Sequence, residues 1–175
     1  MQSVVRIAEG YIYNRAGPEH IPRIHGIETL CFSTPWSEDS FRREFEGGLA
    51  RYFIAIRLSP EGRETELVAG FCGYWKVLDE AHITNVAVHP GHRNIGVGAG
   101  LLDAMIGDMK LNGSKAATLE VSVDNFGAIR LYERFGFERA GIRKNYYENP
   151  GKDAIIMWKR NLQPVGNCQN IMNLL

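Results

Sequence analysis

The feature that most constrains this chain is a glycine-bearing loop that follows an apolar segment and precedes an amphipathic one. The loop is Arg93-Asn94-Ile95-Gly96-Val97-Gly98, and the apolar positions after it have helical spacing: Leu101, Leu102, Met105, Ile106 and Met109. Glycines at a helix start let the backbone approach a ligand, and the free N–H groups there favour an anion. The loop therefore predicts a pyrophosphate site. The alternative is a tight turn whose glycines only supply positive φ.

A dinucleotide-binding loop is a further alternative, since Glu120 lies at about the spacing of a ribose-binding carboxylate. Two features oppose it. Leu101 occupies the position of the third fingerprint glycine, and the loop leaves its strand well before Gly96, whereas the dinucleotide fingerprint follows the strand end directly.

The rest of the chain predicts one α+β domain with a mixed sheet, in the order β-α-α-β-β-β-α-β-α-β-β. Period-two and β-branched patterns predict strands over residues 4–15, 52–58, 67–78, 81–88, 117–123, 137–146 and 154–159. Besides the helix after the glycine loop, which ends at Asn112-Gly113, helices are expected from Pro18, after an N-cap at Ser37, and over 128–135. Residues 1–162 form the expected domain, and 163–175 are expected to be a frayed tail.

Ile21, Ile24, Ile27 and Leu30 are expected to form the buried face of the first helix. Trp36, just before the cap at Ser37, is expected to pack on Phe41 in a hydrophobic staple.

Charge and cysteine content exclude several classes of function. Twenty basic residues balance twenty acidic ones, so no overall charge attracts nucleic acid or a membrane surface. The three cysteines are far apart and form no Cys-x-x-Cys pair, which argues against zinc or a disulfide framework. The start of the chain lacks a signal-peptide core, and no apolar run approaches the ~20 residues of a membrane span. We expect a cytoplasmic protein without a metal site.

The motifs together are similar to those of the GNAT superfamily of N-acetyltransferases. The loop from Arg93 to Gly98 matches its Arg/Gln-x-x-Gly-x-Gly/Ala signature, which cradles the pyrophosphate of coenzyme A. The segment before the loop resembles the fourth strand of the family. Asn125, Ala128-Ile129, Leu131-Tyr132-Glu133 and Phe135-Gly136-Phe137 resemble its next motif. The resemblance covers nearly all of residues 1–162 and implies a GNAT fold with a splayed central sheet, and acetyl-coenzyme A as cosubstrate.

Within the superfamily, the chain resembles the RimI-type ribosomal-protein alanine N-acetyltransferases. The strings that carry this likeness are Cys31-Phe32, Pro35-Trp36-Ser37, Leu119-Glu120-Val121, Arg143-Lys144-Asn145-Tyr146-Tyr147 and Asp153-Ala154-Ile155-Ile156-Met157. The resemblance implies transfer to the N-terminus of a small-subunit ribosomal protein. One departure is the loop, where Asn94 and Ala99 replace a basic residue or glutamine common in relatives. This weakens a side-chain clamp on the phosphates and leaves the backbone cradle intact.

The resemblance also implies roles for individual residues. Backbone groups of Val86, Ala87 and Val88 would hold the pantetheine arm and the thioester oxygen. The loop residues Arg93, Asn94, Ile95, Gly96, Val97, Gly98 and Ala99 would bind the pyrophosphate. Asn125 would cap the following helix, bind the coenzyme, or both.

Glu120 is the candidate general base. Apolar residues flank it on an expected central strand, and burial makes a carboxylate a better proton acceptor. The alternative is a glutamate paired with a surface cation. The resemblance makes Tyr132 the candidate acid, because it lies on the helix after Asn125 where the thiol-facing tyrosine of the family is expected; the alternative is a core aromatic. A phenol (pKa ~10) is a slightly weaker acid than a thiol (~8.5), so the site has to reduce that difference.

Trp36, Tyr146 and Tyr147 are candidate walls of a peptide groove, although two adjacent tyrosines on an edge strand can equally be packing residues. An α-amine (pKa ~7.7–8.0) is easier to deprotonate near neutrality than lysine (~10.4), by about 3.5 kcal/mol at 1.36 kcal/mol per unit. A single glutamate therefore suits a protein N-terminus. Two other functions stay open: acetylation of lysine or a small amine, which a deep acidic pocket would favour, and a non-catalytic coenzyme A sensor.

Overall fold

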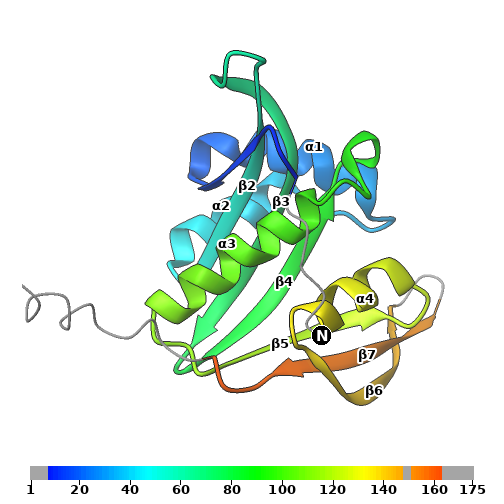
Figure 1. The fold of residues 1–175 in the computed structure, drawn as a ribbon. Coiled ribbons are helices and arrows are strands. Elements are labelled where there is room, and N and C mark those ends of the chain that lie inside the picture. Colours follow the sequence, from blue (N-terminus) through cyan, green and yellow to red (C-terminus); the bar gives the residue numbers. More distant parts are fainter. Residues whose placement is uncertain (1–7, 148–150, 163–175) are drawn as a thin grey trace, which may run out of the picture.

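The fold is built on one seven-stranded mixed sheet. A computed structural model describes residues 8–147 and 151–162 (Figure 1). In sheet order the strands are β1 (Tyr11–Arg15), β2 (Ala50–Leu58), β3 (Glu64–Val77), β4 (Glu80–Val88), β5 (Ala116–Ser122), β7 (Lys152–Lys159) and β6 (Glu138–Tyr147). All neighbouring strands are antiparallel except β4 and β5.

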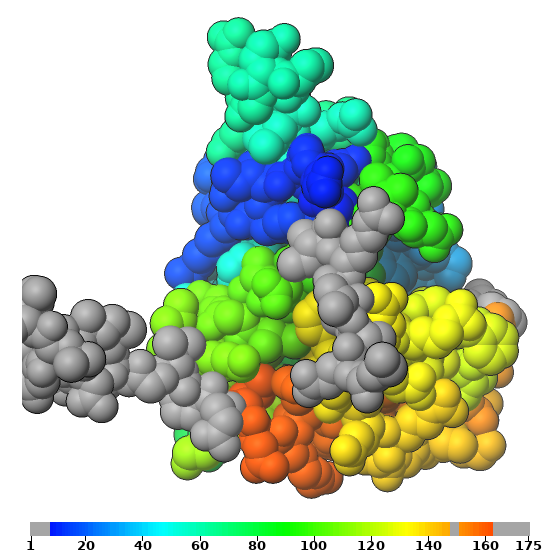
Figure 2. All heavy atoms as spheres, viewed as in Figure 1, coloured from blue at the N-terminus to red at the C-terminus, as the bar shows by residue number. Residues whose placement is uncertain are grey.

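Helices cover both faces of this sheet. In Figure 1, α3 (Val97–Leu111) crosses the front of β2 to β4, and α4 (Phe126–Arg134) lies in front of β5 and β7. Behind the sheet lie α1 (Ile21–Cys31) and α2 (Glu38–Gly47). Short 3₁₀ turns, η1 (Pro18–His20) and η2 (Pro90–His92), precede α1 and the glycine loop. Figure 2 shows the turn between β2 and β3 projecting from the top of the molecule.

Two apolar cores correspond to the two faces. The larger joins α3 and α4 to the sheet and includes Leu101, Met105 and Ile129; the smaller joins α1 and α2 to β2 and includes Ile24 and Phe41. Within the described residues, no helix has both the length and the apolar character needed to cross a membrane.

The predicted order of elements is confirmed, and most differences are at element ends. The Ser37 hydroxyl accepts a hydrogen bond from Ser40 N at 3.1 Å, and the rings of Trp36 and Phe41 are 5.7 Å apart, as the cap and staple predict. The fourth helix begins at Phe126, earlier than residue 128. The first strand begins only at Tyr11, because Gly10 has φ +75° in a turn. Residues 4–7 of that strand and the tail 163–175 lie outside the described residues.

The predicted buried face of the first helix is wrong at one residue, Leu30. Ile21, Ile24 and Ile27 are buried, but Leu30 is 58% exposed. Each residue turns a helix by about 100°, so a strict three-residue spacing rotates steadily off the buried face, and Leu30 lies about 180° from Ile21. Glu28, seven residues after Ile21, is on the buried side instead and is 2% exposed.

The sheet splays between its two halves, as the family resemblance implies. Pairing between β4 and β5 is limited to Glu80–Ala116, Ala81–Ala117 and His82–Thr118. Along the other edge of β4 the register with β3 shifts by one residue at Thr84, which is a β-bulge. From Ile83 to Val88 the β5 side of β4 therefore has no strand partner within the described residues. The backbone N–H groups on that side are available to a ligand.

Candidate active site

A pocket of about 730 Å³ opens beside the unpaired half of β4. Four segments line it: the C-terminal end of α1, the end of β4, the glycine loop with the start of α3, and one side of α4. We call it the β4–α4 pocket. Among the predicted site residues, its lining includes Val86, Ala87, Val88, Arg93, Asn94, Ile95, Gly96, Gly98, Ala99, Asn125 and Tyr132. Val97 belongs to the loop but is 1% exposed and packs into the core.

The glycine loop has the backbone geometry of an anion site. Asn94 and Gly96 both have left-handed φ angles, +62° and +104°, and Gly96 is the N-cap of α3. The first N–H groups of a helix have no acceptor within the helix, and the helix dipole places partial positive charge there. A Cβ on Gly98 would meet only Leu131 at 3.4 Å and Val88 at 3.5 Å, both of which line the pocket. The missing side chain leaves that space open to a ligand.

Arginines add positive charge to this pocket. Arg93 donates from Nε to the Val88 carbonyl at 3.0 Å and from Nη2 to Cys31 Sγ at 3.3 Å, so its side chain joins the loop to β4 and α1. Arg130 and Arg134 line the pocket from α4 and were missed in the sequence. The two arginines are five and nine positions after the Asn125 cap. Because they are four residues apart on one predicted helix, the sequence places them on the same helix face, and this spacing could have predicted their shared site.

Asn125 caps α4. Its side-chain oxygen accepts a hydrogen bond from Ala128 N at 3.1 Å, as one of its two expected roles requires. Since Asn125 also lines the pocket, the same side chain can present its amide N–H groups to a ligand.

Tyr132 is on the following turn of α4 and is only 6% exposed, with its ring packed edge-on against Phe137 at 5.9 Å. Burial, with smaller effects from Cys72 and Tyr147, raises the pKa of Tyr132 well above its usual range. The phenol therefore keeps its proton near neutral pH. The direction of this shift is opposite to the one that would ease proton transfer to a thiolate.

Glu120 is less buried than the sequence suggested. Its side chain is 27% exposed, and Oε1 accepts from Arg143 Nη1 at 2.9 Å, which is the cation pairing considered as the alternative to a base. The strand alternation explains this: Leu119 and Val121 point into the core, so Glu120 faces the opposite side of β5. Its role as a base stays a prediction.

Glu120, Tyr146 and Tyr147 do not line the β4–α4 pocket, but Arg143 contacts both Glu120 and Tyr146. The Arg143 guanidinium lies 5.3 Å from the centre of the Tyr146 ring, and the two tyrosine rings are 5.1 Å apart. Burial first, then the neighbouring Tyr146 and Glu120, raise the pKa of Tyr147, while Tyr147 in turn raises that of Tyr132.

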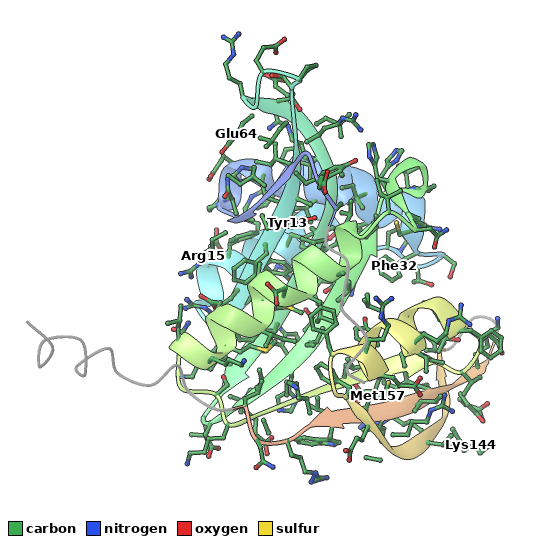
Figure 3. The ribbon with its side chains drawn as sticks, in the orientation of Figure 1. Tyr13, Arg15, Phe32, Glu64, Lys144 and Met157 are labelled. Carbon is green, nitrogen blue, oxygen red and sulfur yellow. The ribbon has the colours of Figure 1, made fainter. Side chains whose placement is uncertain are left out.

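Trp36 does not line the β4–α4 pocket. Its ring packs on Phe41, and its backbone N–H donates to Glu28 at 3.2 Å. The pocket residues from this region are Cys31 and Phe32, which the sequence did not single out as binding residues. Phe32 is 38% exposed and lies beside the end of β4, above α4 in Figure 3. No group of three or more His, Cys, Asp or Glu residues is placed to hold a metal ion within residues 8–147 and 151–162.

Comparison with known proteins agrees with this geometry. The model of the acetyltransferase (GNAT) family matches residues 21–137. The splayed sheet and glycine loop define an acyltransferase fold of that type, and the chain belongs to the GNAT family of N-acetyltransferases. The sheet and its flanking helices are thus a single GNAT-fold domain.

Individual relatives show which N-acetyltransferases of this family the chain is similar to. The chain is 35% identical over 139 residues to the ribosomal protein bS18-alanine N-acetyltransferase of Escherichia coli K12, covering 78% of this chain and 88% of the relative. It is 39% identical over 141 residues to a Bacillus subtilis protein that provisionally carries the same name, covering 80% and 89%. The crystal structure of the Escherichia coli ribosomal-protein-S18-alanine N-acetyltransferase superposes with a TM-score of 0.75 at 31% identity, over 90% of this chain and 97% of that one.

A more distant structural neighbour was determined in complex with acetyl-CoA. The structure of Arabidopsis thaliana NAA60 in complex with acetyl-CoA has a TM-score of 0.75 at 18% identity, over 86% of this chain and 98% of that one. At this identity the likeness shows the fold alone.

Proposed function

We propose that this protein transfers the acetyl group of acetyl-coenzyme A to the N-terminal α-amine of ribosomal protein bS18. The observation that carries the proposal is the 35–39% identity to proteins named for this reaction, over 88–89% of their length. A ribosomal-protein acceptor makes the reaction cytoplasmic.

The β4–α4 pocket fits acetyl-coenzyme A in size and charge. Its volume of about 730 Å³ is within the range of small-molecule sites. The N–H groups at the start of α3 would bind the pyrophosphate, and Arg93, Arg130 and Arg134 supply charge of the opposite sign. The unpaired side of β4 offers backbone groups to the pantetheine arm and to the thioester oxygen, where negative charge develops during transfer.

Three protein groups would move or stabilise charge in the transfer. Glu120 accepts the proton that the amine loses, and the N–H groups of β4 donate to the thioester oxygen. As the carbon–nitrogen bond forms and the carbon–sulfur bond breaks, Tyr132 donates its proton to the leaving sulfur. Because burial raises the pKa of Tyr132, the phenol is protonated near neutral pH and can donate a hydrogen bond to the leaving sulfur.

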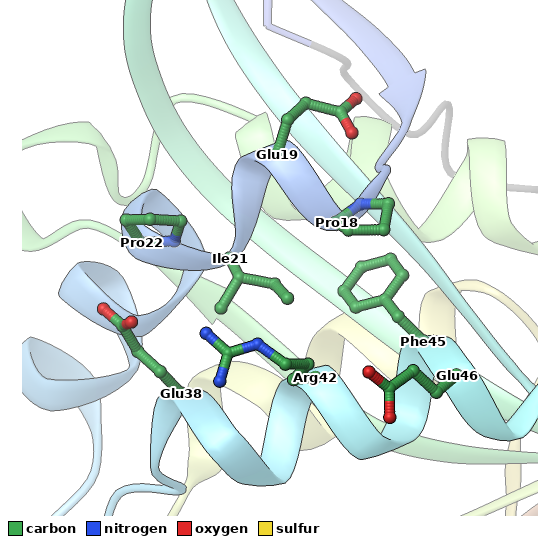
Figure 4. Close-up of a pocket in the computed structure, with 8 residues that line it drawn as sticks. All are labelled: Pro18, Glu19, Ile21, Pro22, Glu38, Arg42, Phe45 and Glu46. Atoms are coloured by element: carbon green, nitrogen blue, oxygen red, sulfur yellow. The ribbon is translucent and has the colours of Figure 1, made fainter.

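The acceptor side favours a protein N-terminus over a small amine. A small cationic substrate would call for an acidic pocket next to the thioester site. One acidic pocket, of about 410 Å³, lies elsewhere, between η1, α1 and α2, where Glu19, Glu38 and Glu46 with Arg42 surround Ile21 and Phe45 (Figure 4). It shares no lining residue with the β4–α4 pocket. The partly exposed Tyr146 and Tyr147 instead offer walls for an extended peptide.

A peptide assay tests this proposal. The protein is incubated with acetyl-coenzyme A and a peptide that carries the alanine N-terminus of bS18, and the product is mapped by mass spectrometry. We expect one acetyl group on the α-amine. The matched control is the same peptide with a blocked α-amine and a free lysine. Acetylation of the control alone would favour a lysine acetyltransferase, and coenzyme binding without any turnover would favour a sensor.

A further inference from the structure

Glu28 is a buried carboxylate that the proposed chemistry does not use. It lies on α1 and is 2% exposed. Oε1 accepts from the backbone N–H of Trp36 at 3.2 Å, and Oε2 accepts from Asn85 Nδ2 at 3.5 Å. Burial raises the pKa of the Glu28 carboxyl, against the opposing effect of these two hydrogen bonds. Apolar residues of similar volume often replace buried ion pairs without loss of stability, so the burial of an ionisable group such as Glu28 is weak evidence of a stabilising role.

The two partners of Glu28 do not line the β4–α4 pocket themselves, but each lies in a segment that supplies lining residues. Trp36 is in the connection from α1 to α2, which contributes Phe32 to the lining, and Asn85 directly precedes Val86 on the unpaired half of β4. A second link joins the same walls further along, where Cys31 Sγ donates to the Val88 carbonyl at 3.4 Å. The two links bracket Val86 and Ala87, the residues proposed to face the thioester.

We propose that Glu28 is a positioning residue that fixes the α1–α2 connection against β4 and so sets where the acceptor amine stands relative to the thioester. The proposal rests on the proposed function only in that this pocket transfers an acetyl group to an amine. Glu28 acts through Trp36 and Asn85. Misplacing reacting groups by ~1 Å can lower a rate by about 100-fold. Loss of the hydrogen bonds of Glu28 should therefore lower kcat more than coenzyme affinity, because the glycine loop and the arginines of α4 would still hold the pyrophosphate.

Two substitutions separate the effect of the two hydrogen bonds from the effect of the Glu28 charge. Glu28→Gln can keep both hydrogen bonds. The amide oxygen accepts from Trp36 N, and the NH₂ group can donate to Asn85 Oδ1 once the Asn85 amide, which now turns Nδ2 toward Glu28, rotates by half a turn. Glu28→Leu has a similar size and removes both bonds. We expect kcat to fall by about 10- to 100-fold in Glu28→Leu and to stay within about threefold of wild type in Glu28→Gln. The acetyl-coenzyme A concentration that gives half of the rise in Tm should be unchanged in both.

The kinetics are measured with the amine that the wild-type protein acetylates best. Failure of the bS18 peptide would thus contradict the proposed acceptor and leave this comparison intact. If Glu28→Leu does not fold, Asn85→Leu removes one of the two bonds and should lower kcat about tenfold. A folded Glu28→Leu or Asn85→Leu protein with wild-type kcat would overturn the proposal. So would a Glu28→Gln protein as impaired as Glu28→Leu, because the charge and not the link would then matter.

Discussion

Tyr132 is buried on α4 and also lines the β4–α4 pocket, so its hydroxyl is the group to test. Tyr132→Phe removes one hydroxyl and keeps the ring against Phe137, so Tm and coenzyme affinity should change little. If Tyr132 is the acid, turnover with acetyl-coenzyme A should fall by about 10²–10⁴. Steady-state kinetics at saturating peptide measure this loss.

Acyl donors with thiols of graded pKa test the role itself. A more acidic thiol needs less help from an acid, so the advantage of wild type over Tyr132→Phe should shrink along the series. A ratio that is constant across donors would reduce Tyr132 to a residue that only orients the thioester. Full activity of the phenylalanine variant would make it a core aromatic.

The Glu120–Arg143 pair allows a matched test of the base. Glu120→Gln should lower kcat by about 10²–10⁴, spare coenzyme binding and remove the acidic limb of the pH–rate profile. The control is Glu133→Gln, because Glu133 also accepts from an arginine of β6, Arg139, at 3.0 Å. Exposed ion pairs contribute only about 0–1 kcal/mol to stability. Equal kinetic losses in both variants, or an unchanged pH profile in Glu120→Gln, would move the base elsewhere.

At the scale of elements, the sequence predicted what depends on local patterns. Each strand and helix carried its own signal of alternation, cap or glycine, so their order could be read directly. The face of α1 was predicted less well, because the strict three-residue spacing that ended at Leu30 rotates off the buried side of the helix. Glu28 shares a helix face with Ile21, and only the partners Trp36 and Asn85, from other segments, show why a carboxylate can be buried there.

The two loop glycines should respond differently to substitution. Gly96 needs its left-handed φ of +104°, so Gly96→Ala should strain the backbone and lower stability by about 1 kcal/mol or more. Gly98 has no positive φ, and an added Cβ would meet its neighbours at ordinary contact distances. Gly98→Ala should keep the Tm of the free protein and weaken acetyl-coenzyme A binding about tenfold, because the methyl group would occupy ligand space. Calorimetric titration and thermal melts check both; unchanged affinity in Gly98→Ala would contradict the cradle.

At the scale of the whole molecule, the sequence predicts those residues of a site that are neighbours in the chain. The pyrophosphate loop and the end of β4 adjoin one another in sequence, and both line the β4–α4 pocket. Cys31 and Phe32 come from a segment far away in the chain. Conversely, Trp36 is near them in sequence but faces Phe41. Such assignments depend on how separate segments pack, which a one-dimensional pattern does not contain.

The attachment of α3 to the sheet gives a prediction about the stability of the whole domain. Asp108, at 16% exposure, accepts from Arg51 Nε at 2.6 Å, from Arg51 Nη2 at 3.0 Å and from the Tyr74 hydroxyl at 2.7 Å. Desolvation acts to raise the pKa of Asp108, but the bonds from Arg51 and Tyr74 outweigh it and the pKa is lowered. The network therefore joins α3 to β2 and β3 through an ionised carboxylate.

A lowered folded-state pKa means that the unfolded chain binds a proton more readily, so this contribution to stability is present above the unfolded value of ~3.9 and is lost as the pH falls through the lower folded value. Asp108→Asn should lower the free energy of unfolding by about 2 kcal/mol at pH 7, since hydrogen bonds to charged groups contribute about 1.5–3 kcal/mol. For a domain of this size that is a loss of about 4–8 °C in Tm. Asp103→Asn, an exposed acid on the same helix, is the control. Denaturant titrations at pH 7 and at pH 3 should show the gap between wild type and Asp108→Asn narrowing with acid. A gap of the same size at both pH values would mean that the Asp108 side chain stabilises the domain through packing alone.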